Sequence, residues 1–435
     1  MKTKQFVAAG LGLMLGYLAT EAAAQSDPRY IRFSNSATKG ALYKPDSGPA
    51  PKIAVLVIHR TSNFMNHIST TELAQRGFLV LGMNPRSDNN EAAVDWDANQ
   101  LDVREGVEFL KKQPGIQKVV LLGHSGGGPT TSYYQAVAEN GLSYCKGANK
   151  LVECNDKVAG APKADGLILV DAHPGNSVNG LRSLNGALTD ENDITKIDPS
   201  LDPFNPKNGF NPNGDSTYSK EFQDRYYKAQ SDRMNRLIDK AQKMLVEMKA
   251  GRHQPADDES FVIYRNRGRL MDISTGVHGS TVKPQKLLKN DGTVDASKPV
   301  KTVRVSTPDN AKRDAEFGDV RQLTIKSFLS ANAVKSKSAL DGIDWCSSNN
   351  STPCAVQNIS VPLLVTAMGG HYFIRDNEIT YEMAKSADKD FIVLEGAVHG
   401  MTPCKPCSAA TGQDYGNATK NFFDYLAAWM NKRFS

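Results

Sequence analysis

The feature that most constrains the fold is a series of short runs in which nearly every residue is apolar. Continuous apolar runs, unlike alternating ones, are typical of parallel strands that are buried on both faces. Polar loops and helix-like stretches separate the runs, among them residues 97–112, which have apolar side chains near helical spacing before Pro114-Gly115. Strands that alternate with helices predict an α/β fold with a doubly wound, mostly parallel sheet. The runs are residues 53–58, 78–83, 118–122, 166–170, 362–368 and 390–394.

A glycine-rich turn follows the third of these runs. It reads Gly123-His124-Ser125-Gly126-Gly127, and the stretch after it can be helical. A Gly-x-Ser-x-Gly sequence between a strand and a helix is typical of the sharp turn that presents a nucleophilic serine. The flanking glycines remove side chains that would collide with the neighbouring strand and helix. Ser125 is therefore the candidate nucleophile.

With two other segments, this turn resembles the α/β-hydrolase family. The two segments are Ile58-His59, at the end of the first run, and Gly396-Ala397-Val398-His399-Gly400, just after the last run. The resemblance covers roughly residues 50–175 and 359–432. In this family the catalytic histidine lies in the loop after the final strand. The resemblance therefore implies that His399 is the base that takes the proton of Ser125.

The resemblance also implies an oxyanion hole made of two backbone amides. One amide belongs to Gly126, the residue after the nucleophile, and the other to the loop after His59. The family commonly has His-Gly at this strand end, whereas this chain has His59-Arg60-Thr61. Because arginine does not adopt glycine-like conformations freely, the second donor is left open between Thr61 and Arg60.

The carboxylate that would orient His399 has three candidates. Most family members carry it a few residues past the penultimate strand, but the matching segment here, residues 369–374, contains no acid. Asp171 directly follows the fourth apolar run and resembles the acid of family lipases that place it after this earlier strand. Glu378 and Asp376 fall in the first turn of a predicted helix, where acids usually serve as helix caps. We rank Asp171 first, Glu378 second and Asp376 third.

Three further histidines are expected to line the site. His124 is the variable position of the turn, and His173 and His371 follow strand ends on the side where α/β proteins bind ligands. Their position beside Asp171 raises metal-dependent hydrolysis as an alternative, but no metal-binding spacing is evident, so we predict neither a metal nor another cofactor. The histidines expected on the surface, because they lie in polar stretches, are His67, His253 and His278.

The amino terminus is typical of an export signal. Lys2 and Lys4 precede an apolar stretch over residues 6–18, and Ala22-Ala23-Ala24 offers small residues for cleavage before Gln25. The stretch is short for a membrane span, and no other segment approaches its length. We expect residues 1–24 to be removed as a signal peptide and the mature chain, without a transmembrane segment, to be exported to a bacterial periplasm or beyond.

Cysteine spacing and charge fit an exported enzyme. Local pairing is expected for the six cysteines, although fifteen connectivities are possible. The last pair lies just after His399 and would staple the histidine loop, whereas its CxxC spacing lacks the second half of a zinc site. The formal net charge of +5 and the lack of a long basic run argue against a nucleic-acid partner. The pairs are Cys145 with Cys154, Cys346 with Cys354, and Cys404 with Cys407.

A long segment between the core strands is expected to form a cap. Residues 25–175 and 359–435 would make the two parts of the hydrolase core, and residues 176–358 an insertion that lies over the active site and belongs to the same domain. The insertion is predicted to contain a turn-rich stretch over 176–215, an amphipathic helix from Ser219 to about Lys249, a polar stretch over 276–301 and a further helix near 320–330.

These observations predict an exported serine hydrolase that acts through an acyl-enzyme on small carboxylic esters. A peptidase or amidase with the same three catalytic residues is the alternative within this chemistry. A non-catalytic binding protein on the same fold is the alternative outside it, and the presence of both Ser125 and His399 argues against it. The sequence leaves the acyl group, the leaving group and the oligomeric state open.

Overall fold

A ten-stranded sheet forms the centre of the molecule, in a computed structural model that describes residues 27–34, 37–252, 257–306 and 320–435. The strand order is β1-β2-β4-β3-β5-β6-β13-β14-β9-β10, and the strands from β4 to β9 in this order are parallel. All six apolar runs lie in this parallel part, so the predicted doubly wound, mostly parallel sheet is confirmed. The strands are β1 (Arg29–Arg32), β2 (Lys39–Tyr43), β3 (Ile53–Val57), β4 (Leu79–Asn84), β5 (Lys118–His124), β6 (Gly166–Val170), β9 (Lys286–Leu288), β10 (Val294–Asp295), β13 (Leu363–Met368) and β14 (Lys389–Leu394).

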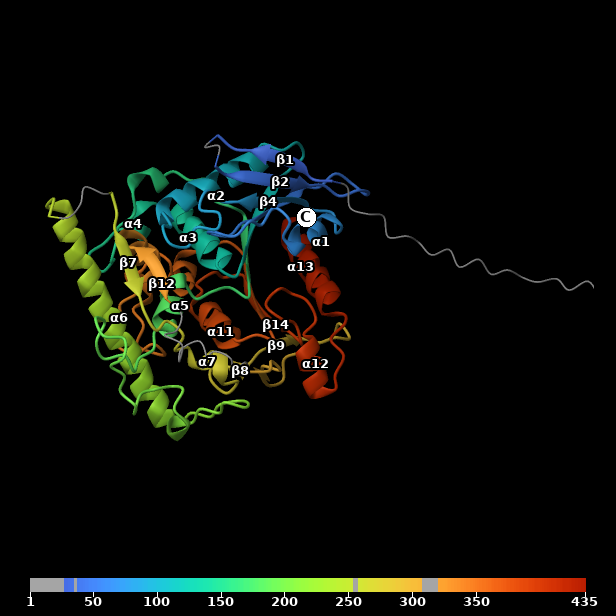
Figure 1. The fold of residues 1–435 in the computed structure, drawn as a ribbon. Helices are drawn as coiled ribbons and strands as arrows, with labels where there is room; N and C mark the ends of the chain where they lie inside the picture. Colours follow the sequence, from blue (N-terminus) through green and yellow to red (C-terminus); the bar gives the residue numbers. More distant parts are fainter. Residues whose placement is uncertain (1–26, 35–36, 253–256, 307–319) are drawn as a thin grey trace, which may run out of the picture.

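Helices cover both faces of the sheet, which explains the continuous apolar runs. In β3, Leu56 packs in a cluster with α2 (Trp96–Lys111) and α3 (Gly127–Asn140). Its neighbours Val55 and Val57 face the other way, toward α1 (Ile68–Ala74) and α13 (Ala418–Phe434). Figure 1 shows α2 and α3 on one side of the sheet and α13 on the other. Every position of a central strand therefore loses contact with water.

The predicted helices of the core and the long helix of the insertion are present. Asp95 caps the first helical turn of α2 by accepting a hydrogen bond from the Ala98 amide. Ser219 caps α6 (Lys220–Lys249) through the Phe222 amide in the same way. The other helices of the described residues are α4 (Leu142–Cys145), α5 (Asn176–Ser183), α7 (Leu270–Ile273), α9 (Ile325–Ser327), α10 (Thr352–Ala355), α11 (Ile374–Met383), α12 (Lys405–Thr411), and the short turns η1 (Asp156–Val158), η2 (Pro206–Asn208), η3 (Phe328–Asn332), η4 (Trp345–Ser347) and η5 (Val356–Asn358).

Residues 176–358 differ from expectation in two places. The region near 320–330, expected as one helix, begins with a strand, β12 (Arg321–Thr324), which pairs with β7 (Ser260–Ile263) before α9 and η3 follow. The polar stretch over 276–301, for which no element was predicted, forms strands: β8 (Ser280–Pro284) pairs with β11 (Pro299–Lys301), while β9 and β10 extend the central sheet beyond β14. β9 is held as a strand by its pairing with β14, which the polar composition of this stretch does not suggest.

A hydrophobic cluster of its own holds this segment together. Side chains of α5, α6, α7, β7, β12 and η3 pack in it, separately from the two clusters that flank the sheet. Figure 1 shows α6 along the side of the molecule, away from α13.

All three cysteine pairs are disulfides, as local pairing predicts. The pair Cys404–Cys407 lies beside the histidine loop, and the Cys404 amide donates a hydrogen bond to the carbonyl of Gly396. A bridge between Ala397 and Pro403 closes the same loop. The predicted signal peptide lies outside the described residues, and among the described helices none is both long and apolar enough to cross a membrane.

Candidate active site

Ser125 occupies a strained turn between β5 and α3. Its φ is +58°, in the left-handed region that residues with a side chain rarely adopt. Close packing explains the glycines around it: a Cβ on Gly123 would collide with Thr131, and a Cβ on Gly127 with the carbonyl of Ile58. The Ser125 amide donates to the carbonyl of Val170, at the end of the neighbouring strand β6, at 3.1 Å. The sequence thus folds into a turn that lifts one serine above the carboxyl end of the sheet.

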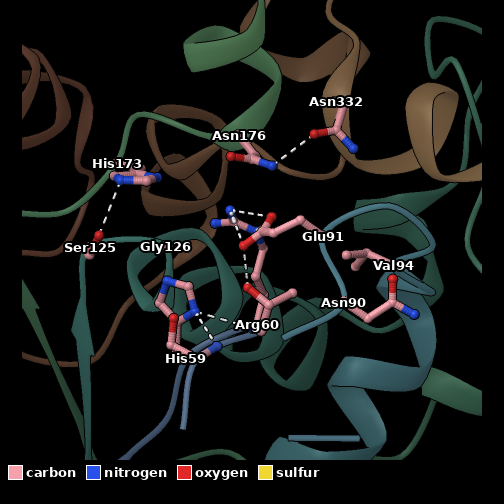
Figure 2. Close-up of polar contacts among 12 residues, drawn as sticks. His59, Arg60, Asn90, Glu91, Val94, Ser125, Gly126, His173, Asn176 and Asn332 are labelled. Atoms are coloured by element: carbon pink, nitrogen blue, oxygen red, sulfur yellow. Dashed lines mark hydrogen bonds and ion pairs between the residues drawn. The ribbon is translucent and has the colours of Figure 1, made fainter. Parts of the chain in front are cut away.

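The Ser125 hydroxyl forms a hydrogen bond with His173, not with His399. The distance from Ser125 Oγ to His173 Nε2 is 3.1 Å (Figure 2). Burial, together with the nearby charge of Arg60, lowers the pKa of His173 well below its usual value, so its ring is neutral at pH 7. The Nδ1 atom of His173 is buried and has no hydrogen-bond partner among the described residues. His173 can therefore accept the hydroxyl proton of Ser125, but no carboxylate supports it.

His399 is instead paired with Asp171. His399 Nδ1 donates to Asp171 Oδ2 at 2.6 Å, and the Met368 amide donates to Asp171 Oδ1 at 3.2 Å. Asp171 is fully buried at the end of β6 and has a φ of +41°. Burial alone would raise the pKa of Asp171, but contacts with His371 and His399 outweigh it and hold this pKa below its usual range. The carboxylate therefore stays charged.

Asp171 has a second histidine neighbour. His371 Nδ1 lies 2.6 Å from Asp171 Oδ2, although it is not aligned for a hydrogen bond. Its ring stacks on that of His399, with centroids 4.4 Å apart. Burial lowers the pKa of His371 against the opposing effect of Asp171. One carboxylate oxygen thus faces two imidazoles.

The two other candidate acids are bound elsewhere. Glu378 is buried and accepts hydrogen bonds from the amides of Val282 at 2.7 Å and Lys283 at 3.0 Å, which ties β8 to α11. Asp376 forms a buried ion pair with Arg182 at 2.6 Å. Within the part of the chain that the structure describes, neither acid contacts a histidine of the serine site. The histidine near Asp376 is His278, at 3.9 Å.

Three more histidines surround the serine turn. His124 Nε2 contacts the carbonyl oxygen of His399 at 2.9 Å, and His124 Nδ1 contacts His67 Nε2 at 3.0 Å. His59 Nδ1 accepts hydrogen bonds from the amides of Thr61 and Ser62. Burial is the main cause that lowers the pKa of each, to about 4 for His67 and well below the usual value for His59 and His124. These rings are neutral at pH 7.

Two histidines expected on the surface are not there. His67 is half-buried beside His124, and the side chain of His278, only 6% exposed, lies next to Tyr227 and the Arg182–Asp376 pair. Burial lowers the pKa of His278 to about 3. Polar neighbours in the sequence gave no sign of this tertiary burial. His253 lies outside the described residues.

The loop after β3 brings Arg60 against the serine turn. A Cβ on Gly126 would collide with Arg60 Nη1 and His59 Nε2, so a larger residue there would have to displace these side chains. The Thr61 amide is engaged with His59 Nδ1 at 3.1 Å. Arg60 Nη2 donates to both carboxylate oxygens of Glu91, at 2.8 and 3.0 Å (Figure 2).

The same side chains offer donor atoms that suit a metal ion. One atom each from Asp171, His371 and His399 lies within 4.8 Å of the others. A carboxylate oxygen with two imidazole nitrogens is a chemically reasonable ligand set for a first-row transition metal. The shortest contacts within it, however, are those between Asp171 and the two rings.

Comparison with known proteins adds little beyond shape. No protein-family model matches the chain, and no curated protein matches its sequence. Among solved structures, the chain is similar to DcsB in complex with its substrate analogue (TM-score 0.44, 11% identity, 94% of this chain and 99% of that chain). It is also similar to Est1E from Butyrivibrio proteoclasticus (TM-score 0.41, 9% identity, 94% of this chain and 99% of that chain). A third similar structure is brefeldin A esterase, a bacterial homologue of human hormone sensitive lipase (TM-score 0.43, 11% identity, 96% of this chain and 80% of that chain). Such scores and identities carry no argument about activity.

The fold assignment rests on the chain itself. The sheet is doubly wound and mostly parallel, with Ser125 in the turn after β5 and His399 in the loop after β14, as the resemblance implies. The positive φ at Ser125 is the local strain expected of a nucleophile turn. By its strand order and its serine turn, this chain is an α/β-hydrolase in fold.

Proposed function

We propose that the protein is a serine hydrolase that cleaves carboxylic esters through an acyl-enzyme on Ser125. The observation that carries the proposal is a strained serine at the carboxyl end of the sheet, at the same edge as the hydrogen-bonded pair of Asp171 and His399. His399 is within reach of the serine turn, because its backbone carbonyl contacts His124 and its ring stacks 6.4 Å from that of His173. The proposal requires that the Ser125 hydroxyl turn from His173 toward His399 during the reaction.

In this mechanism His399 takes the proton as Ser125 Oγ attacks the ester carbonyl carbon. Asp171 holds the imidazole in the tautomer that can accept this proton and stabilises the imidazolium that results. His399 then gives the proton to the leaving alkoxide, and a water molecule attacks the acyl-enzyme with His399 again as the base. The Gly126 amide would donate to the oxyanion. Since the Thr61 amide is engaged with His59, we assign the second donor to the amide of Arg60.

His173 is assigned a supporting role. It holds the Ser125 hydroxyl in the resting enzyme, but its buried ring has no carboxylate to stabilise a positive charge. We therefore expect His399→Gln to lower kcat by at least the 10²- to 10⁴-fold that is usual for loss of a general base. The matched variant His173→Gln should lower kcat by no more than about tenfold, the scale of losing its one hydrogen bond to Ser125. Steady-state kinetics on one ester would compare the two variants. The reverse order of effects would make His173 the base.

We also propose that residues 176–358 act as the cap and that the mature enzyme is exported. The cap proposal is supported by a cavity that adjoins His173 and is lined largely by residues of this segment. Export is supported by the amino-terminal pattern in the sequence and by three disulfides, which persist in oxidising compartments.

A matched pair of substrates tests the proposed function. The mature protein should release para-nitrophenol from para-nitrophenyl butyrate with an initial burst, and should cleave the corresponding para-nitroanilide far more slowly. A chelator such as EDTA should leave the rate unchanged. Faster cleavage of the anilide would favour a peptidase. A rate that EDTA abolishes and zinc restores would instead indicate a metal-dependent hydrolase in which Asp171, His371 and His399 bind the metal.

A further inference from the structure

A cavity of about 450 Å³ opens beside His173, the hydrogen-bond partner of the candidate nucleophile. Because His173 lies in its wall and bonds the Ser125 hydroxyl, only this one side chain separates the cavity from the serine. The opposite wall comes from residues 176–358, including Asn176, which lies above Arg60 in Figure 2. The volume suits a small organic molecule.

Among the described residues, more arginines than acids line the wall of this cavity. Its charged residues are four arginines and two acids, and one of the acids, Glu91, is paired with Arg60. The histidine in the wall does not change this balance, because burial lowers the pKa of His173 and keeps it neutral. An excess of guanidinium groups in a partly enclosed site attracts anions. The arginines are Arg60, Arg267, Arg269 and Arg321, and the acids are Glu91 and Asp272.

Arg60 leaves one nitrogen without a partner next to the reacting serine. Its Nε and Nη2 atoms bind Glu91, but Nη1 is buried and has no hydrogen-bond partner among the described residues. The Arg60 side chain is only 6% exposed, and Nη1 lies against Gly126, the residue after Ser125. A buried, unpaired N–H group of an arginine is costly unless something else binds it. A substrate oxygen would do so.

Arg269 reaches the same cavity with mostly neutral partners. Its Nη1 donates to the Tyr372 hydroxyl at 3.0 Å and its Nη2 to Ser183 Oγ at 2.8 Å. The carboxylate of Asp272 is 3.9 Å from Nη1, too far for a hydrogen bond. Its Nε is buried and has no hydrogen-bond partner within the described residues. These contacts hold the guanidinium in place without cancelling its charge.

We infer that the cavity is an anion subsite and that the preferred ester carries an anionic oxygen group, such as a carboxylate, a sulfate or a phosphate, a few bonds from the scissile carbonyl. This inference rests on the proposed function, because it assigns the cavity to the substrate of Ser125. Guanidinium groups bind such oxyanions through paired N–H donors. The anionic group can belong to the acyl part or to the leaving alcohol, and the experiment includes both.

Two esters that differ by one charge test the subsite. The para-nitrophenyl monoester of adipic acid and para-nitrophenyl hexanoate have acyl chains of equal length, which end in a carboxylate and a methyl group. The enzyme should show a kcat/KM about tenfold to a hundredfold higher for the adipate ester, the scale of one charge-assisted hydrogen bond. High salt should reduce this ratio. A butyrate ester of para-hydroxybenzoate, compared with phenyl butyrate, repeats the comparison with the anion on the leaving group.

Arg269→Gln should lower the ratio of kcat/KM for the anionic ester to that for its neutral counterpart about tenfold, in whichever of the two comparisons shows the preference. The variant removes a charge but keeps an amide that can bond Tyr372 and Ser183. The control Arg76→Gln, at a surface pair with Glu72 and Asp424, should keep the ratio of the wild type. If neutral esters are cleaved as well as anionic ones in both arms, the subsite is contradicted and the esterase stands. If no ester is cleaved, the proposed function fails instead. In that case, calorimetric binding of the adipate dianion to the Ser125→Ala variant tests the subsite on its own. The anion should bind, and a second Arg269→Gln change should weaken the binding; no binding would contradict the subsite.

Discussion

Ser125→Ala is expected to lower the turnover of para-nitrophenyl butyrate by about 10⁴- to 10⁶-fold, the range measured when a nucleophilic serine is removed. Without the hydroxyl no acyl-enzyme forms, and only binding and the backbone donors remain. The cost in stability is small, because alanine keeps the Cβ at the same positive φ and only the 3.1 Å bond to His173 is lost. That loss amounts to about 1 kcal/mol. Stopped-flow kinetics and a thermal melt measure both effects.

Ser132→Ala is a matched control for this variant. Ser132 is buried within α3, seven residues after Ser125, and its hydroxyl donates a hydrogen bond to the carbonyl of Pro129 at 3.4 Å. We expect wild-type turnover from this variant. Turnover by Ser125→Ala within tenfold of the wild type would remove Ser125 from the mechanism.

Asp171→Asn should lower kcat by about 10⁴-fold, because the amide favours the wrong tautomer of the histidine that it holds. The substitution preserves shape, and the carboxylate it replaces is the one that accepts from His399 at 2.6 Å. Glu378→Gln is the contrasting variant. It weakens buried hydrogen bonds between β8 and α11 and should cost roughly 1–3 kcal/mol of stability while turnover persists.

The two variants separate catalytic from structural carboxylates by two measurements, kcat and the melting temperature. A large loss of kcat in Glu378→Gln with little loss in Asp171→Asn would identify Glu378 as the catalytic carboxylate, in the later loop where most of the family carries it. It would also leave the contact between Asp171 and two histidines without a catalytic role.

The sequence was sufficient for the part of the fold that depends on local pattern. Continuous apolar runs predicted the parallel strands, because burial on both faces leaves a clear trace in composition. Cysteines eight or nine residues apart predicted their own pairing, as did Cys404 and Cys407. Helix α6 was predicted from its apolar stripe, with a start at Ser219, which the structure shows to be the residue that caps it.

Features that depend on tertiary contacts were missed. β9 is only three residues long and lies in a polar stretch of the sequence, and it becomes a strand because β14 offers it a free edge. His278 lies in a polar stretch, yet its side chain is only 6% exposed and lies next to Tyr227. The bond between Ser125 and His173, and the approach of Arg60 to Gly126, join segments far apart in the chain. No pattern within one segment carries such information, so the arginines of the cavity could not be recognised as a group.

The most direct test of the central claim is the site of covalent attachment of a phosphonate ester. The protein should react with para-nitrophenyl alkylphosphonate until about one para-nitrophenol per chain is released, as one acyl-enzyme site requires. Peptide mass spectrometry should then place the adduct on Ser125, and the Ser125→Ala variant should remain unlabelled. Continued ester turnover in a phosphonate-treated protein without an adduct on Ser125 would contradict the account.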